Sequence, residues 1–135
     1  MRRVIGIGET ILDLLFKNNQ PTVAVPGGSV FNGLVSLGRA GAKVTFISEV
    51  GGDRVGNIIL DFMKENGICT DSVVVYPERK SPISLAFLNE KNDAEYSFYK
   101  DYPSLRLDVD MPEVTSDDIV MFGAFYAITP QLRDK

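Results

Sequence analysis

KVTFISEVGGDRVGNIILDFMKENG, residues 43–67, joins one strand to one helix. Residues 43–50 form a mostly apolar run, typical of a strand that is buried on both faces of a parallel sheet. Asp53 can cap a helix whose apolar residues recur at helical spacing, and Gly67 stands where that helix would end. The order strand, helix, strand, helix along the chain predicts an α/β domain with a parallel sheet.

A second strand–helix unit precedes this one. Residues 3–8 are predicted to form a buried strand, and the apolar residues 9–16 to continue it. The next helix is expected from Ser29, a suitable N-cap, to about residue 40, with Gly41 in the position of a C′ glycine.

The pattern changes after residue 70, because several strand-like runs follow without helices between them. Together with a short strand at 23–25 they are expected to form an antiparallel sheet that stands apart from the parallel one; the runs are 73–76, 83–89 and 94–99. Residues 119–123 indicate a further buried strand. Thr129 and Pro130 can begin a helix that the chain does not complete, which favours a truncated piece of a longer α/β protein.

Composition excludes several classes of function. The 135 residues suit one domain, and the net charge of −4 without a dense basic run argues against nucleic-acid binding. With no histidine, a Ser-His-Asp triad and a histidine-bound zinc are excluded. Cys69, the single cysteine, cannot form an internal disulfide, which favours a protein of a reducing compartment. Its side chain is expected to be buried. The longest apolar run, 119–128, is about half the ~20 residues of a membrane helix, so a cytoplasmic protein is expected.

The glycine clusters do not complete a known nucleotide motif. The cluster that begins at Gly6 has Ile11 where a dinucleotide fingerprint needs its third glycine. Gly28 and Gly33 have the spacing of a P-loop, but the lysine and the hydroxyl residue that should follow are absent. A dinucleotide-dependent oxidoreductase is therefore disfavoured.

A different set of motifs occurs in a characteristic order. They are Gly6-x-Gly8-Glu9-x-x-x-Asp13, Gly27-Gly28-Ser29-Val30-Phe31-Asn32, Gly38-x-x-Gly41 and Gly51-Gly52-Asp53-x-x-Gly56. This series resembles the N-terminal half of the PfkB, or ribokinase-like, carbohydrate kinases over essentially all 135 residues. Ser29-Val30-Phe31 departs from the family's usual Ala-Pro-Ala, which leaves the sugar preference open.

The resemblance implies a fold and an oligomeric state. It implies a parallel sheet flanked by helices and a small antiparallel β lid, with lid strands near 12–26 and 73–100. Residues 1–135 would be the N-terminal portion of a single kinase domain whose C-terminal ATP-binding half is absent. Because the lid strands carry apolar residues on both faces, we expect one face to cover the active site and the other to pair in a homodimer.

The resemblance also implies a set of substrate-binding residues. Asp13 lies in an apolar segment, where a carboxylate needs either exposure or a hydrogen-bonding partner, and the family's matching acid holds sugar hydroxyls. The Asn32 amide can form a hydrogen bond at the helix cap or contact a hydroxyl-rich ligand. The six implied residues are Asp13, Gly27, Gly28, Asn32, Tyr99 and Lys100.

The function implied is that of an ATP-dependent, fructokinase-like sugar kinase that uses Mg²⁺. This chain would supply the sugar-binding half, and the catalytic and ATP-binding residues would lie outside it. The alternative is a non-catalytic sugar-binding or oligomerisation fragment. The motifs do not separate fructose, ribose, 2-keto-3-deoxygluconate and nucleosides as substrates.

Overall fold

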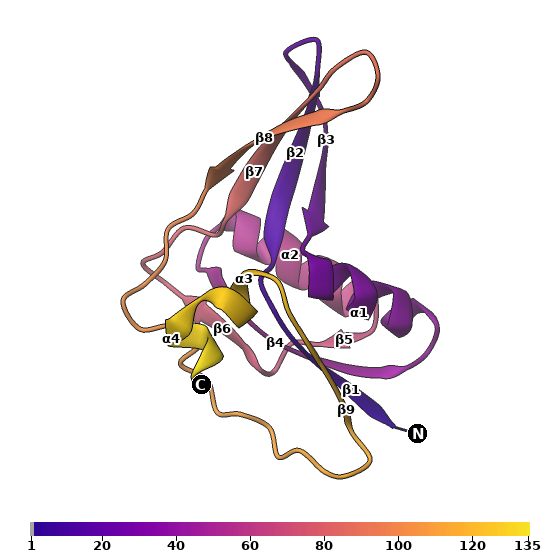
Figure 1. Cartoon of the computed structure of the whole chain (residues 1–135), viewed down its shortest axis with the longest axis vertical. Helices are drawn as coiled ribbons and strands as arrows, with labels where there is room; N and C mark the ends of the chain where they lie inside the picture. The colour runs from indigo at the N-terminus through magenta and orange to yellow at the C-terminus, as the bar shows by residue number, and fades with distance from the viewer. Residues whose placement is uncertain (1) are drawn as a thin grey trace.

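Two sheets organise the molecule. The computed structural model describes residues 2–135. Figure 1 shows a parallel sheet in the lower part of the view and four strands that rise above it, here called the lid. The parallel sheet consists of β1 (Arg3–Ile7), β4 (Lys43–Gly51), β5 (Ile68–Cys69), β6 (Val73–Tyr76) and β9 (Ile119–Phe122). The lid consists of β2 (Ile11–Lys17), β3 (Gln20–Gly27), β7 (Ile83–Leu88) and β8 (Ala94–Tyr99).

The parallel sheet has the order β5-β4-β1-β9. Strand β6 also pairs with β4, along residues 48–51, whereas β5 pairs with residues 44–45 of the same strand. The α/β class and the parallel sheet are confirmed. The prediction that residues 73–76 belong to the lid is wrong, because they pair in parallel with Ser48–Gly51 and bury Val73 in the main core. A run of valines has the same pattern in either sheet, so its pattern could not decide between them.

The separate lid is also confirmed, with the order β3-β2-β7-β8. It contains two antiparallel hairpins, β2–β3 and β7–β8, which are joined by a parallel pairing of β2 with β7. Residues 9–16 do not continue the first strand as predicted, because the chain leaves the parallel sheet at Gly8 and enters the lid at Ile11. The Leu12 N–H then donates to the Pro82 carbonyl at 3.0 Å, in the segment that leads into β7.

Helices α1 (Ser29–Arg39) and α2 (Arg54–Glu65) pack against one face of the parallel sheet (Figure 1). Asp53 caps α2 as predicted, since its carboxylate accepts from the Gly56 N–H at 2.8 Å. The prediction for Ser29 is wrong: Gly28 is the N-cap of α1, without a side-chain cap bond, and Ser29 is the first helical residue. Helix α1 therefore starts with its first N–H groups free of a capping side chain.

The opposite face is covered by the C-terminal part of the chain. The short helices α3 (Phe125–Ile128) and α4 (Pro130–Arg133) contribute Tyr126 and Leu132 to a second core, with Leu107 from the long connection between β8 and β9. Pro130 begins α4 as predicted. The Thr129 hydroxyl donates backward to the Phe125 carbonyl and does not cap α4.

Two predictions of burial are wrong. Strand β9 is mostly exposed, because it is an edge strand that pairs only with β1. Cys69 is exposed as well, since it ends the two-residue edge strand β5, in which Ile68 is the buried residue. An apolar composition indicates a strand, but its place in the sheet determines how much of it is covered.

Candidate functional site

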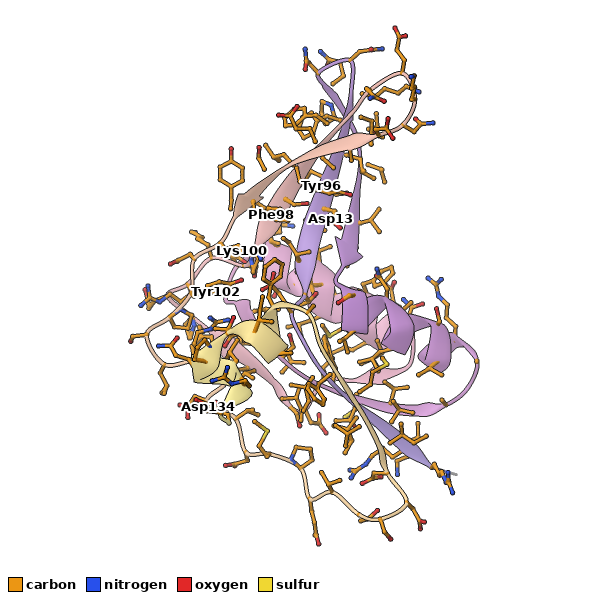
Figure 2. The ribbon with its side chains drawn as sticks, in the orientation of Figure 1. Asp13, Tyr96, Phe98, Lys100, Tyr102 and Asp134 are labelled. Atoms are coloured by element: carbon orange, nitrogen blue, oxygen red, sulfur yellow. The ribbon has the colours of Figure 1, made fainter. Side chains whose placement is uncertain are left out.

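A cavity of about 430 Å³ lies between the lid and the carboxyl end of the parallel sheet. Its walls come from the segment after β1, from β2, from the start of α1, from β8 and from the start of α3. This is the edge at which open α/β sheets bind ligands, and the volume suits a small molecule. Figure 2 shows Asp13, Phe98 and Lys100 grouped where the lid meets the rest of the molecule.

Asp13 lies on the cavity face of β2 and has a hydrogen-bonding partner. The Ser84 hydroxyl, from the neighbouring strand β7, donates to Asp13 Oδ1. Asp13 Oδ2 lies beside Gly27, where a Cβ atom would stand only 2.6 Å from it. The partner expected for this carboxylate is therefore Ser84, and the glycine keeps the second oxygen unobstructed.

Gly28 and Asn32 bring the first turn of α1 to the same cavity. Gly28 has a φ of 135°, a conformation that side chains rarely adopt, and a Cβ atom there would collide with the Glu9 carbonyl oxygen. The Asn32 N–H donates to the Gly28 carbonyl at 2.8 Å, while its amide side chain is on the exposed, cavity-lining side. The helix start therefore offers an amide that can both donate and accept.

Lys100 also lines the cavity, directly after β8. Its Nζ lies 2.6 Å from Glu9 Oε1, and the Tyr102 hydroxyl donates to Glu9 Oε2 at 2.6 Å. Burial, reinforced by the bond to Glu9 and its charge, raises the pKa of Tyr102 well above its ordinary value. Tyr102 is therefore a neutral donor over the whole working pH range.

Tyr99 is not brought to this cavity. Along β8 the side chains alternate, so Tyr96 and Phe98 share the cavity face while Tyr99 lies on the other face of the lid. Phe98 thus occupies the place beside Lys100 that was expected for the tyrosine. The sequence pattern located the end of the strand correctly but did not indicate which of two adjacent aromatic residues faces inward.

Sequence reasoning missed two contributors to the cavity. Glu9 belongs to the Gly6–Asp13 motif, in which no role is assigned to it. The sequence feature that could have indicated a functional role is an acid directly after a buried strand. Phe125 is exposed, lines the cavity and has its ring centre 4.2 Å from Lys100 Nζ. No pattern in the sequence connects either residue to Lys100.

A buried ion pair holds the connection after β8 in place. Arg106 Nε contacts Glu49 Oε1, the Leu107 N–H donates to Glu49 Oε2 at 2.9 Å, and both charged side chains are buried. The Arg106 guanidinium also lies 3.7 Å from the centre of the Tyr102 ring. This arrangement positions Tyr102, and through it Glu9.

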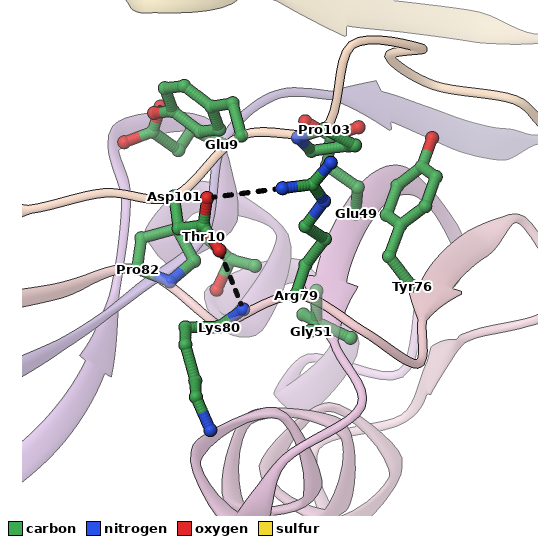
Figure 3. A pocket seen from close by; sticks show the side chains of 12 residues that line it. Glu9, Thr10, Glu49, Gly51, Tyr76, Arg79, Lys80, Pro82, Asp101 and Pro103 are labelled. Atoms are coloured by element: carbon green, nitrogen blue, oxygen red, sulfur yellow. Dashed lines mark hydrogen bonds and ion pairs between the residues drawn. The ribbon is translucent and has the colours of Figure 1, made fainter.

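A smaller pocket at the root of the lid separates Glu9 from the loop at residues 79–80 (Figure 3). Asp101 lies 3.6 Å from Arg79 and accepts from the Lys80 N–H at 3.4 Å, both dashed in Figure 3. The Thr10 hydroxyl oxygen lines this pocket and is buried without a hydrogen-bond partner among the described residues. These contacts tie the end of β8 to the segment before β7.

Within residues 2–135, no cluster of three or more acidic, histidine or cysteine side chains could hold a metal ion. Over the same residues, no helix is long and apolar enough to cross a membrane.

Comparison with known proteins identifies the family to which the chain belongs. The family model described as "pfkB family carbohydrate kinase" matches residues 1–132. The chain belongs to this family. It is 26% identical over 133 residues to a fructokinase of Rhizobium leguminosarum bv. trifolii, a match that covers 93% of this chain and 40% of that protein.

Further relatives are also sugar kinases, and the match again covers only part of each of them. A ribokinase of Bacillus subtilis is 41% identical over 64 residues, or 47% of this chain and 20% of that protein. The solved structure of a fructokinase with bound ATP from Xylella fastidiosa superposes with a TM-score of 0.64 and 26% identity, over 73% of this chain and 33% of that one. The chain thus spans well under half the length of these relatives. The resemblance to the PfkB family and the ribokinase-like fold are both confirmed.

Proposed function

We propose that this chain is the sugar-binding part of an ATP-dependent, fructokinase-like kinase that transfers a γ-phosphoryl group to a sugar hydroxyl. The observation that carries the proposal is the convergence of Asp13, Gly28, Asn32 and Lys100 on one cavity beneath the lid. These residues come from β2, from the start of α1 and from the end of β8. Family membership supplies the reaction class, and the names of the relatives favour a sugar as acceptor.

The chemistry of the cavity suits a polyhydroxylated ligand. Asp13 can accept hydrogen bonds from two hydroxyls, and Asn32 can donate to one and accept from another. The ring of Phe98 can cover the apolar face of a sugar, and the four-stranded lid would shield the site from water. Gly27 belongs to the same site because it leaves room for the Asp13 carboxylate.

Phosphoryl transfer itself would require residues outside this chain. Neither carboxylate that lines the cavity is proposed as the base, because Glu9 is paired with Lys100 and Asp13 is assigned to binding sugar hydroxyls. ATP and its Mg²⁺ would be held mainly by the remainder of the domain, and Mg²⁺ would screen the phosphates when bound. We therefore expect the 135-residue chain alone to bind sugar without turning it over. Such a kinase would work in the cytoplasm, where ATP and free sugars meet.

The lid also supports a homodimer. Its register places Val23, Val25, Tyr96 and Phe98 on the same face as Asp13, and all four are exposed. This is the face that lines the cavity, so the dimer is proposed through it and not through the opposite face, which the sequence predicted. A second copy here would bury apolar surface that a single chain leaves open.

The test is a panel of acceptors assayed for ATP-dependent ADP release. The protein encoded by the complete gene, the isolated 135-residue chain and an Asp13→Asn variant of the complete protein are each given fructose, ribose, 2-keto-3-deoxygluconate and a nucleoside. Turnover of one acceptor by the complete protein, with strong loss in the variant and none in the isolated chain, is the expected result. Absence of acceptor-dependent ADP release by the complete protein would instead favour a non-catalytic sugar-binding fragment.

A further inference from the structure

The charge of the cavity is set by three side chains among the described residues, Glu9, Asp13 and Lys100. Two are acids and one is a base, so the cavity lining carries more negative than positive charge. Lys100, the cation among them, is engaged by Glu9 at 2.6 Å. The side chains of Lys100 and Glu9 are only 18% and 11% exposed.

Each end of this ion pair has further partners. Tyr102 donates to the second Glu9 oxygen at 2.6 Å, so both oxygens of the carboxylate are occupied. Lys100 Nζ lies 4.2 Å from the Phe125 ring centre and 5.2 Å from that of Phe98, within the range of cation–π attraction. The positive charge of Lys100 is thus balanced from several sides before any ligand enters.

We infer that Glu9 determines the substrate class: by neutralising Lys100, it makes the cavity select an uncharged polyhydroxylated sugar and reject a sugar acid. The inference rests on the proposed function, because it concerns the acceptor in the same cavity. A neutral sugar needs only the hydrogen bonds of Asp13 and Asn32. A carboxylated sugar must draw Lys100 away from Glu9 and leave that largely buried carboxylate without its cation. It must also approach the like charge of Asp13.

Titration calorimetry on the protein from the complete gene can test this directly. Dissociation constants are measured for fructose, ribose and 2-keto-3-deoxygluconate with the wild type, with Glu9→Gln and with the double variant Glu9→Gln/Lys100→Gln. The matched control is Glu95→Gln, which removes an exposed carboxylate from the other face of β8 and should leave the preference unchanged.

The wild type is expected to bind one of the neutral sugars at least tenfold more tightly than the acid. Glu9→Gln should reduce the ratio of the acid's dissociation constant to that of the neutral sugar by tenfold or more, because it frees the Lys100 charge. The double variant should restore the preference for the neutral sugar. Equal or tighter binding of the acid by the wild type would overturn the inference and leave the kinase proposal standing. An unchanged ratio in Glu9→Gln would also overturn it. Binding of none of the three sugars would refute the proposed function, and this inference with it.

Discussion

At the scale of single residues, two glycines allow the close backbone approaches that shape the cavity. Gly27 leaves the space beside Asp13 Oδ2, and Gly28 lets the chain pass the Glu9 carbonyl before α1 begins. Ser84 orients the other carboxylate oxygen from the adjacent strand. The site therefore depends on residues that lack side chains as much as on those that supply polar groups.

Asp13→Ala is expected to raise the sugar dissociation constant more than tenfold while the fold is retained. Each charge-assisted hydrogen bond that is lost contributes ~1.5–3 kcal/mol, and the residue is only partly buried. Calorimetry with the best acceptor measures the change. Asp71→Ala, which removes an exposed carboxylate elsewhere, should bind sugar as the wild type does. Unaltered affinity in Asp13→Ala would show that this carboxylate does not hold the sugar.

Gly28→Ala is expected to lower the free energy of unfolding by about 2 kcal/mol or more. The φ of 135° is strained for any residue with a side chain, and the added methyl group would press on the Glu9 backbone. Urea denaturation followed by circular dichroism measures the loss. Ser29→Ala is the control, and it should have a small effect because the Ser29 side chain does not cap α1.

At the scale of elements, an ion pair fastens the edge strand β9 to β1. Arg3 Nη2, at the start of β1, lies 2.6 Å from Asp118 Oδ2, one residue before β9. The hydrogen bond from Arg3, supported by the Thr115 N–H, lowers the pKa of Asp118 from 3.8 to about 2. Because the carboxylate is favoured in the folded state, its contribution to stability is present above pH ~4 and is lost as the pH falls toward 2.

Asp118→Asn should therefore lower the denaturation midpoint at neutral pH. The difference from the wild type should shrink as the pH falls from 4 toward 2, since the wild-type carboxylate becomes protonated there. Urea titrations at several pH values measure this. Asp117→Asn, at the exposed neighbouring position, should show no such convergence. A difference that stays constant with pH would mean that the charge of Asp118 does not stabilise the strand pair.

At the scale of the whole molecule, the lid projects beyond the body (Figure 1), and one of its faces exposes apolar side chains. Val23 is 49% exposed and Tyr96 is 53% exposed, although both lie in strands. A sheet edge and face of this kind rarely stay uncovered, because apolar patches favour association. The lid is therefore the surface through which we expect two copies to meet.

Val23→Asp is expected to convert a homodimer of the complete protein to a monomer, or to weaken it at least tenfold, because a buried carboxylate would face the partner lid. Light scattering at micromolar concentration measures the mass. Ser97→Asp places the same charge on the other face of the lid and should leave the dimer intact. A wild-type protein that is monomeric under these conditions would contradict the proposed assembly.

Local sequence patterns predicted much of this protein. The strand–helix unit at residues 43–67, the Asp53 cap and the family motifs depend on neighbours in the chain, so they could be recognised without coordinates. Asp13 and Asn32 could be predicted as site candidates for the same reason, because each belongs to a short motif at a strand or a helix start, and both line the cavity.

Only the tertiary structure decided which strands pair and which faces meet. The pairing of β6 with β4, the exposure of β9 and the inward turn of Phe98 in place of Tyr99 follow from sheet order and register. A shift of one residue moves every side chain of a strand to the other face, so composition alone cannot set these features. Glu9 and Lys100 are 91 residues apart in the chain, and their contact exists only because the lid folds back over the end of β1.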